Sequence, residues 1–219
     1  MHQHSNRQSQ SFIDWEPPSP KNGMDTFIGP GATMAELVLQ FGGAFITACL
    51  LYWHSIGQHA QEREEITAFA KIGTFLLAMD MAGGVVTNST SAAKRWYHRS
   101  SQTVKDHLGF VAIHALQIGL VARQCDVTDN SGNTVSAFCY FGLVYGYILI
   151  SSMIILAVPL YLQRPTAMWL TTLSIPLTLA LYSPRGLEWF IPLLSIKLLV
   201  SHLPKEAPFQ PDDISTKDD

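Results

Sequence analysis

Long apolar segments alternate with short polar ones along this chain, and the length of the apolar segments indicates the fold class. A helix needs about 20 apolar residues to cross the hydrocarbon core of a membrane. Six segments approach that length, namely 33–55, 66–87, 104–122, 136–162, 166–183 and 186–203. We therefore predict an all-α fold, a polytopic transmembrane helix bundle of about six spans.

The six segments do not meet the requirement equally. The first, second and fourth satisfy it by both length and composition, whereas the third carries two histidines and a glutamine. The last two are short and are separated by the turn sequence SPRG at 183–186, which allows a tight helical hairpin or a partly re-entrant pair. Five spans therefore remain an alternative to six.

The two ends of the chain lack this apolar pattern. Residues 1–31 are rich in Ser, Gln, Pro and His, and residues 204–219 form a short acidic segment. Such compositions cannot bury enough apolar surface to offset the entropy of folding. We expect a disordered tail at 1–31, a helical bundle at 32–203 and a second disordered tail at 204–219.

Composition supports membrane insertion and limits the partners. Of the 219 residues, 47% are hydrophobic and 14% are charged, against about a quarter charged in soluble domains. The net charge is -3, and the only basic cluster lies between the second and third segments, so nucleic acid is excluded as a partner. The expected partners are the lipid bilayer and a lipophilic small molecule, while the oligomeric state is left open.

Basic residues predict the orientation, because they concentrate in cytoplasmic loops. With six spans and a cytoplasmic amino terminus, the cytoplasmic side holds Arg7, Lys21, Lys94, Arg95, Arg99, Lys105, Arg164, Lys205 and Lys217. The other side holds only Arg63, Arg123 and Arg185. We predict cytoplasmic termini in a multi-pass protein of an endomembrane that resembles the endoplasmic reticulum. The loop 123–135 then faces an oxidising lumen, where Cys125 and Cys139 form either a disulfide or two separate thiols.

Asp80 is the most informative single residue, because an acid at the centre of a membrane helix costs at least about 2.5 kcal/mol. Lys197 lies at nearly the same depth in the sixth segment, which runs in the same direction. A carboxylate and an ammonium are cheaper to bury together than apart, so we predict an ion pair between Asp80 and Lys197. Gly83 and Gly84 follow the acid and allow neighbouring helices to approach it closely.

Other polar residues fall in the same cytoplasmic half of the bundle. His107 and His114 are seven residues apart on one helix face, and Glu36 and Gln40 share a face of the first helix. We predict a cytoplasm-facing pocket with Asp80, His107 and His114 as catalytic residues, in which an imidazole tunes the proton of Asp80. Its predicted lining is completed by Glu36, Gln40, Asn88 and Lys197. The alternative is a set of interhelical contacts that only hold the bundle together.

Two further groups of residues have both a functional and a structural interpretation. Glu188 begins the sixth segment, where it is either a second catalytic acid or a cap of the helix N-terminus. Lys94, Arg95 and Arg99 belong to the sequence KRWYHR, which suits contact with a lipid headgroup or phosphate but also serves as an ordinary topology determinant.

No cofactor and no metal ion are expected. Axial ligands of one haem come from opposite sides of the iron, whereas His107 and His114 share a face about 10 Å apart. The chain also lacks the HxxxH and ExxH pairs of dinuclear sites.

In size, helical build and isolated intramembrane acids such as Asp80 and Glu188, the chain resembles the small integral-membrane terpene cyclases of fungal meroterpenoid pathways. Six spans rather than seven are a departure from that family. The resemblance implies a lyase or isomerase of secondary metabolism, in which an acid protonates an epoxide or alkene of a prenylated substrate. We therefore expect an enzyme that cyclises or isomerises a lipophilic, isoprenoid or polyketide-like biosynthetic intermediate. The alternative is a non-catalytic assembly factor or carrier.

Overall fold

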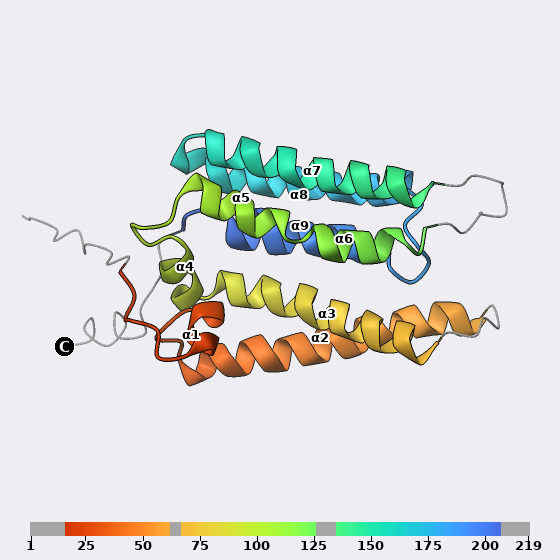
Figure 1. Cartoon of the computed structure of the whole chain (residues 1–219), viewed down its shortest axis with the longest axis horizontal. Coiled ribbons are helices and arrows are strands. Elements are labelled where there is room, and N and C mark those ends of the chain that lie inside the picture. Colours follow the sequence, from red (N-terminus) through yellow and green to blue (C-terminus); the bar gives the residue numbers. More distant parts are fainter. Residues whose placement is uncertain (1–15, 62–66, 126–134, 207–219) are drawn as a thin grey trace, which may run out of the picture.

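All secondary structure in the computed structural model is helical within residues 16–61, 67–125 and 135–206, which are the residues it describes. Two short helices, α1 and α4, lie at one end of the longer ones (Figure 1). The helices in chain order are α1 (Gly23–Ile28), α2 (Met34–Gln61), α3 (Ala68–Ser89), α4 (Ser91–Tyr97), α5 (Val104–Ala112), α6 (Ala115–Ala122), α7 (Ala137–Ala157), α8 (Leu160–Ala180), α9 (Phe190–Ser195) and the π-helix η1 (Ile196–His202).

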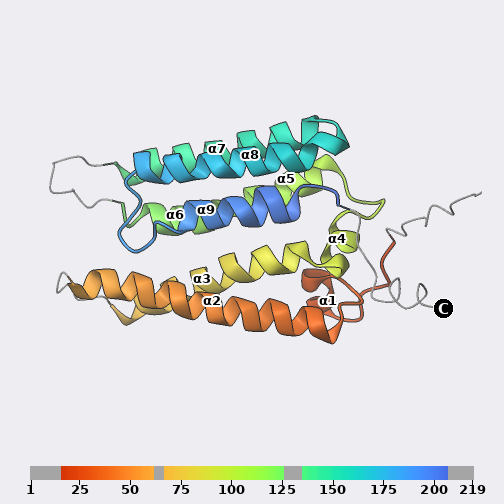
Figure 2. The same ribbon diagram turned by 180° about the vertical axis from the view of Figure 1, so that it is seen from behind.

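The long helices form three layers (Figures 1 and 2). The first layer is the antiparallel hairpin of α2 and α3, and the third is the hairpin of α7 and α8. Between them lie α5 and α6, end to end, beside the continuous run of α9 and η1. Since α3 packs against η1 and α9, this contact joins the first layer to the rest of the bundle.

Three helices in the described residues are long and apolar enough to cross a membrane, fewer than the six spans predicted. They are Met34–Gln58, Ala68–Ser89 and Ala137–Ala157, which correspond to the first, second and fourth predicted segments. The prediction of an all-helical fold is confirmed for the described residues, and these three helices are candidate membrane spans. The other three segments fall short for separate physical reasons.

The third predicted segment is divided into α5 and α6 by an interruption at Ile113 and His114. There the backbone N–H of His114 donates to the carbonyl of Val111 at 3.1 Å, an i to i−3 bond that tightens the helix locally. Neither resulting helix is half the length of a span.

The fifth and sixth segments are limited by proline and by length. Val158 is extended because it precedes Pro159, so α7 ends at Ala157 and α8 begins at Leu160, earlier than the predicted residue 166. Helix α8 contains Pro165 and Pro176, and its first turns include polar residues. The last apolar helix covers only Phe190–His202.

Side-chain caps explain where several helices begin. Thr67, Thr90 and Ser136 each accept a hydrogen bond from the backbone N–H three residues later, at the starts of α3, α4 and α7. At the start of α5, Thr103 and Asp106 form a reciprocal capping box. The turns between the helices are therefore encoded locally.

The buried core lies mainly between α5, α6, α7, α8 and the run of α9 and η1. Its largest fully buried side chains include Tyr140, Phe190, Ile118, Ile148 and Leu198. In contrast, the outward faces of α2, α7 and α8 expose many large apolar side chains, such as Trp53, Phe138 and Leu179. Such extensive apolar exposure fits contact with lipid rather than with water.

Part of the expected disordered tail forms α1. Asn22 caps this helix by accepting a hydrogen bond from the backbone N–H of Asp25 at 2.9 Å. At its end Gly29 has a φ of 92° and lies against the backbone of Ala92, where a Cβ would overlap, so the segment packs on α4. Residues 1–15 and 207–219 of the two predicted tails lie outside the described residues.

Cys125 and Cys139 are not bridged, so the disulfide alternative is wrong. Cys125 is buried at the end of α6 with its Sγ 3.9 Å from the carbonyl oxygen of Val121. Cys139 is exposed in the first turn of α7. Because one thiol faces the core and the other faces outward, the two side chains do not meet.

Candidate functional site

The predicted ion pair between Asp80 and Lys197 is confirmed. Nζ of Lys197 donates to Oδ1 of Asp80 at 2.8 Å, which joins α3 to η1. The two side chains differ sharply in exposure, because Lys197 is 4% exposed and Asp80 is 38% exposed. The ammonium is therefore enclosed by the bundle while the carboxylate faces an opening.

Glycines make this contact possible, as the sequence predicted. A Cβ on Gly84 would overlap the aliphatic stem of Lys197, and a Cβ on Gly83 would lie 3.3 Å from the Cβ of Ala44 on α2. The two glycines therefore allow α3 to pack closely against the Lys197 side chain on one side and against α2 on the other.

The ion pair lines a pocket of about 210 Å³ between α3, η1 and the junction of α5 and α6. Helices α1 and α4 close its end through Phe27 and Tyr97, and the Tyr97 hydroxyl donates to the carbonyl of Phe27 at 3.0 Å. The complete lining is Phe27, Asp80, Gly84, Thr87, Asn88, Tyr97, Phe110, Ile113, His114, Gln117 and Lys197.

Four of the seven predicted pocket residues line this pocket, namely Asp80, Asn88, His114 and Lys197. Asn88 is buried and its Nδ2 donates to the carbonyl of Lys197 at 3.4 Å. His114 occupies the interruption between α5 and α6 and lines the pocket from the middle layer.

Glu36 and Gln40 lie away from the pocket and have structural contacts. Glu36 accepts hydrogen bonds from the backbone N–H and hydroxyl of Thr33 at 2.8 and 3.0 Å, and from the backbone N–H of Ala92 at 3.4 Å. It thereby caps α2 and the start of α4. Oε1 of Gln40 accepts from the Thr87 hydroxyl at 3.2 Å, on the side of Thr87 that faces α2.

Gln117 is a pocket residue that the sequence analysis missed. Its Nε2 donates to Oδ2 of Asp80 at 3.1 Å, so the carboxylate has one partner on each oxygen. Gln117 lies three residues after His114, a spacing that places both on the same helix face. That spacing was the available signal for it.

His107 lies outside the pocket, in a cluster with His98 and His202. Nδ1 of His107 lies 3.3 Å from Nε2 of His202, and Nε2 of His98 donates to the carbonyl of His202 at 3.0 Å. The His202 ring stacks on Phe110 with centroids 4.1 Å apart, which places an apolar ring between this cluster and His114. Within the described residues, no group of three His, Cys, Asp or Glu side chains is arranged to hold a metal ion.

The three basic residues of the KRWYHR sequence bond to the protein itself. Lys94 is buried and its Nζ donates to the carbonyl of Pro204 at 2.9 Å. Arg95 donates to the carbonyl of Glu16 at 3.2 Å. The guanidinium of Arg99 lies 3.7 Å from the centre of the Trp96 ring. These contacts tie α4 to both ends of the described chain.

Burial controls the charge states around α4, which lies at one end of the longer helices. It lowers the pKa of His98 to about 3, with further lowering by His107 and Lys94, so this imidazole is neutral at physiological pH. Burial also lowers the pKa of Lys94 to about 8, against an opposing effect of Glu206. The uncharged His98 is thus a packing element of this end of the bundle.

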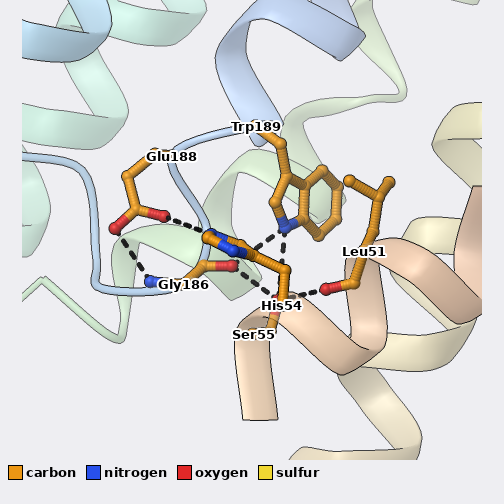
Figure 3. A network of polar contacts seen from close by, with 6 residues as sticks. All are labelled: Leu51, His54, Ser55, Gly186, Glu188 and Trp189. Atoms are coloured by element: carbon orange, nitrogen blue, oxygen red, sulfur yellow. Dashed lines mark hydrogen bonds and ion pairs between the residues drawn. The ribbon is translucent and has the colours of Figure 1, made fainter. Parts of the chain in front are cut away.

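Glu188 lies in a separate network that joins α2 to the turn before α9 (Figure 3). Its Oε1 accepts from the backbone N–H of Gly186 at 2.9 Å, and its Oε2 lies 3.5 Å from Nε2 of His54. The Ser55 hydroxyl lies 2.5 Å from the carbonyl oxygen of Gly186 and 3.2 Å from Nε1 of Trp189.

This network is distant from Asp80. Glu188 precedes Lys197 by nine residues, on the order of 13 Å at the helical rise. Glu188 and Asp80 therefore do not share a site. The carboxylate of Glu188 bonds back to the turn at Gly186, and α9 has no side-chain hydrogen bond at its N-cap, so the predicted cap is not formed.

No protein-family model, no curated protein and no solved structure matches the chain.

Proposed function

We propose that this chain is a multi-pass membrane enzyme that cyclises or isomerises a lipophilic small molecule by moving a proton through Asp80. One observation carries the proposal: the carboxylate of Asp80 opens into the pocket while its partner Lys197 is buried behind it. An ion pair that only held the helices together would not require its carboxylate to be exposed to a pocket. A mostly apolar pocket with a few polar side chains directed into it is a typical small-molecule site.

The ion pair favours a base over an acid as the starting state of Asp80. Lys197 and Gln117 both donate to the carboxylate and stabilise its negative charge. The carboxylate then takes a proton from the substrate and returns it to another atom of the same molecule. The product is a cyclised or rearranged isomer of isoprenoid or polyketide-like type, and no other reactant is consumed. This differs from the alkene-protonating acid that the resemblance implies.

His114 supports the same step as a positioning residue. Its Nδ1 lies 2.8 Å from the carbonyl oxygen of Phe110, and a carbonyl only accepts, so Nδ1 carries the proton. Nε2 of the neutral ring is then an acceptor, and His114 is one of the residues that line the pocket. We assign no catalytic role to His107 or Glu188, because neither lines this pocket.

The proposal includes six membrane crossings with both termini in the cytoplasm of an endomembrane. It rests on the distribution of basic residues and on the helical segments that lie lengthwise along the bundle (Figures 1 and 2). These are α2, α3, α5 followed by α6, α7, α8, and α9 followed by η1. Single cysteines replacing Ser100, Pro159 and Arg185 in a cysteine-free background test it with a membrane-impermeant maleimide. Ser100 and Pro159 should label from the cytoplasmic side and Arg185 from the other side. Labelling of all three from one side would contradict six crossings.

A non-catalytic membrane component, such as an assembly factor or carrier, is the second candidate. The burial of Lys197 against Gly84 favours it, because the lysine stem is part of the packing between η1 and α3. In that case the ion pair only holds the first layer onto the others. The two candidates differ in whether the carboxylate is needed after the fold is intact.

Product analysis separates them. Membranes that contain the chain are incubated with a prenylated-phenol epoxide and with a long-chain β,γ-unsaturated ketone, two probes that rearrange without a change of mass. Chromatography should show an isomer of at least one probe, and Asp80→Asn should lower its formation by at least a hundredfold. Glu206→Gln removes an exposed carboxylate as the control and should retain activity. Full activity of an Asp80→Asn protein that inserts normally would refute the assignment.

A further inference from the structure

Lys197 is paired with a group that is able to take its proton. Its Nζ donates to Oδ1 of Asp80 at 2.8 Å, and transfer of that proton leaves a neutral amine beside a carboxylic acid. Lys94 is also buried, but it donates to the carbonyl of Pro204, and a peptide carbonyl does not take up a proton at ordinary pH. Lys197 therefore has a local route to the neutral amine, the form in which lysine is a nucleophile.

The side chain of Lys197 follows the wall of the pocket. Its Cε, Cδ and Cγ would lie 2.3, 2.7 and 3.0 Å from a Cβ added to Gly84, so its stem crosses α3 at that glycine. Its Nζ ends at Asp80, one turn earlier on the same face of α3. Gly84, Asp80 and Lys197 all line the pocket. The amine and the acid therefore belong to the same cavity.

The size and the rim of the pocket indicate which molecule fits. Its volume of about 210 Å³ is below the range of about 300–1,000 Å³ that encloses a whole drug-sized ligand. Phe27 and Ile113 also line it, and these apolar side chains are 56% and 65% exposed. The pocket therefore encloses a small polar head, while an attached apolar chain has a surface to follow outside it.

A carbonyl group is the small polar head that uses the amine as well as the acid. A carboxylate is a weak base toward a carbon-bound hydrogen beside a plain ketone. When a lysine amine converts the ketone to an iminium ion, the positive nitrogen withdraws electrons from the neighbouring C–H bond and makes that hydrogen more acidic. The amine that Asp80 needs for this chemistry is its own ion-pair partner.

We propose that Lys197 is a catalytic residue that binds a lipophilic ketone or aldehyde as an iminium ion. This proposal rests on the proposed function, since Asp80 then takes its proton from the bound molecule. The neutral amine attacks the carbonyl carbon and a C–N bond forms. The carbonyl oxygen leaves as water, with one hydrogen from Nζ and one from the acid form of Asp80. The iminium ion is then left beside the Asp80 carboxylate.

A β,γ-unsaturated ketone is the substrate type that suits both residues. Asp80 takes a hydrogen from its α-carbon, and the electrons of that C–H bond shift toward nitrogen to give a neutral dienamine. Asp80 returns the proton to the γ-carbon, which moves the C=C bond into conjugation and restores the iminium ion. One water molecule, as many as were released, hydrolyses the iminium ion to the conjugated ketone and to the ammonium of Lys197.

Reductive trapping tests the covalent site without turnover. The purified chain in lipid nanodiscs is treated with decanal and sodium cyanoborohydride, which reduces iminium ions, and alkylated lysines are located by peptide mass spectrometry. Lys197 should gain a decyl group about tenfold faster or more than Lys71, an exposed lysine on α3. A long-chain β,γ-unsaturated ketone should slow the trapping of Lys197, whereas the alkene of the same length without a carbonyl group should not.

Lys197→Arg tests the catalytic role, because arginine keeps a positive charge for Asp80 but forms no iminium ion. Isomerisation of the ketone should fall by about a hundredfold or more, whereas the matched control Lys71→Arg should retain it. Wild-type isomerisation of the ketone by a folded Lys197→Arg protein overturns the role of Lys197 and leaves that of Asp80 intact.

Trapping in the wild-type chain decides the matter even if that variant does not fold. Alkylation of Lys71 without alkylation of Lys197 overturns the covalent site, even if the epoxide probe is isomerised. Trapping at Lys197 that the ketone slows, found without isomer formation from either reaction probe, supports the site and refutes only the catalytic proposal.

Discussion

Asp80 and Lys197 form the charged pair at the centre of the candidate site. Their pairing was predictable because two opposite charges at one depth in an apolar bundle have few other ways to offset their desolvation. The difference in exposure between them was not predictable, because it depends on where α5 and α6 are interrupted. That difference is what turns an ion pair into a candidate reaction centre.

The histidine cluster was missed at the residue scale. His98 follows the end of α4, His107 lies on α5 and His202 on η1, and no periodicity along the sequence links three separate elements. The sequence analysis therefore assigned His107 to the pocket on the basis of its spacing from His114. The interruption at Ile113 removed the single continuous face on which that assignment depended.

Burial of neutral His98 predicts that acid destabilises the fold. Its pKa falls from 6.5 to about 3 in the folded chain, so below pH 6.5 the unfolded chain binds a proton that the folded chain does not. The free energy of unfolding should therefore decrease as the pH falls from 6.5 toward 3, by on the order of 4 kcal/mol in total.

Thermal unfolding in detergent at pH 7 and pH 4.5 measures this effect. The midpoint of the wild-type chain should fall with pH, and His98→Gln should show a smaller fall because one titrating group is removed. An identical pH dependence in the two proteins would show that His98 does not contribute.

At the scale of elements, apolar length predicted α2, α3 and α7 but not the interruptions of the other helices. The segment 104–122 contains no proline, so nothing local marked the break between α5 and α6. The sequence also did not indicate the π-helical geometry of η1. This seven-residue element carries Lys197 near its start and His202 at its end. The start of α8 at Leu160 was missed because Gln163, Arg164 and Pro165 look like a loop.

Two glycines of α3, Gly84 at the contact with η1 and Gly73 away from it, should respond differently to substitution by alanine. Gly84→Ala places a methyl group on the stem of Lys197, which should displace the lysine and cost about 1–3 kcal/mol. Gly73→Ala on α3 meets no atom within 4 Å, and alanine favours a helix by up to about 1 kcal/mol over glycine.

Thermal midpoints of the two glycine variants in the same detergent provide the measurement. We expect Gly84→Ala to melt below the wild type and Gly73→Ala to match or exceed it. Equal midpoints for both variants would mean that α3 does not approach Lys197 as closely as the structure shows.

At the scale of the whole molecule, polar contacts join the α2 and α3 hairpin to the rest of the bundle at two levels. Asp80 and Lys197 form one, and the network of Ser55, Gly186 and Trp189 forms the other (Figure 3). Only the first borders the pocket. A helix bundle of this kind was predictable from hydropathy, whereas the separation of Glu188 from Asp80 required the arrangement of the helices.

The most direct test of the central claim compares Asp80→Asn with the double variant Asp80→Asn, Lys197→Met in stability and in isomer formation. Removing one partner leaves a buried charge, and removing both relieves that cost. We predict that the double variant regains the thermal stability that Asp80→Asn loses but forms no isomer from either reaction probe. Isomer formation at the wild-type rate by the stable double variant would contradict the claim that the carboxylate of Asp80 performs the chemistry.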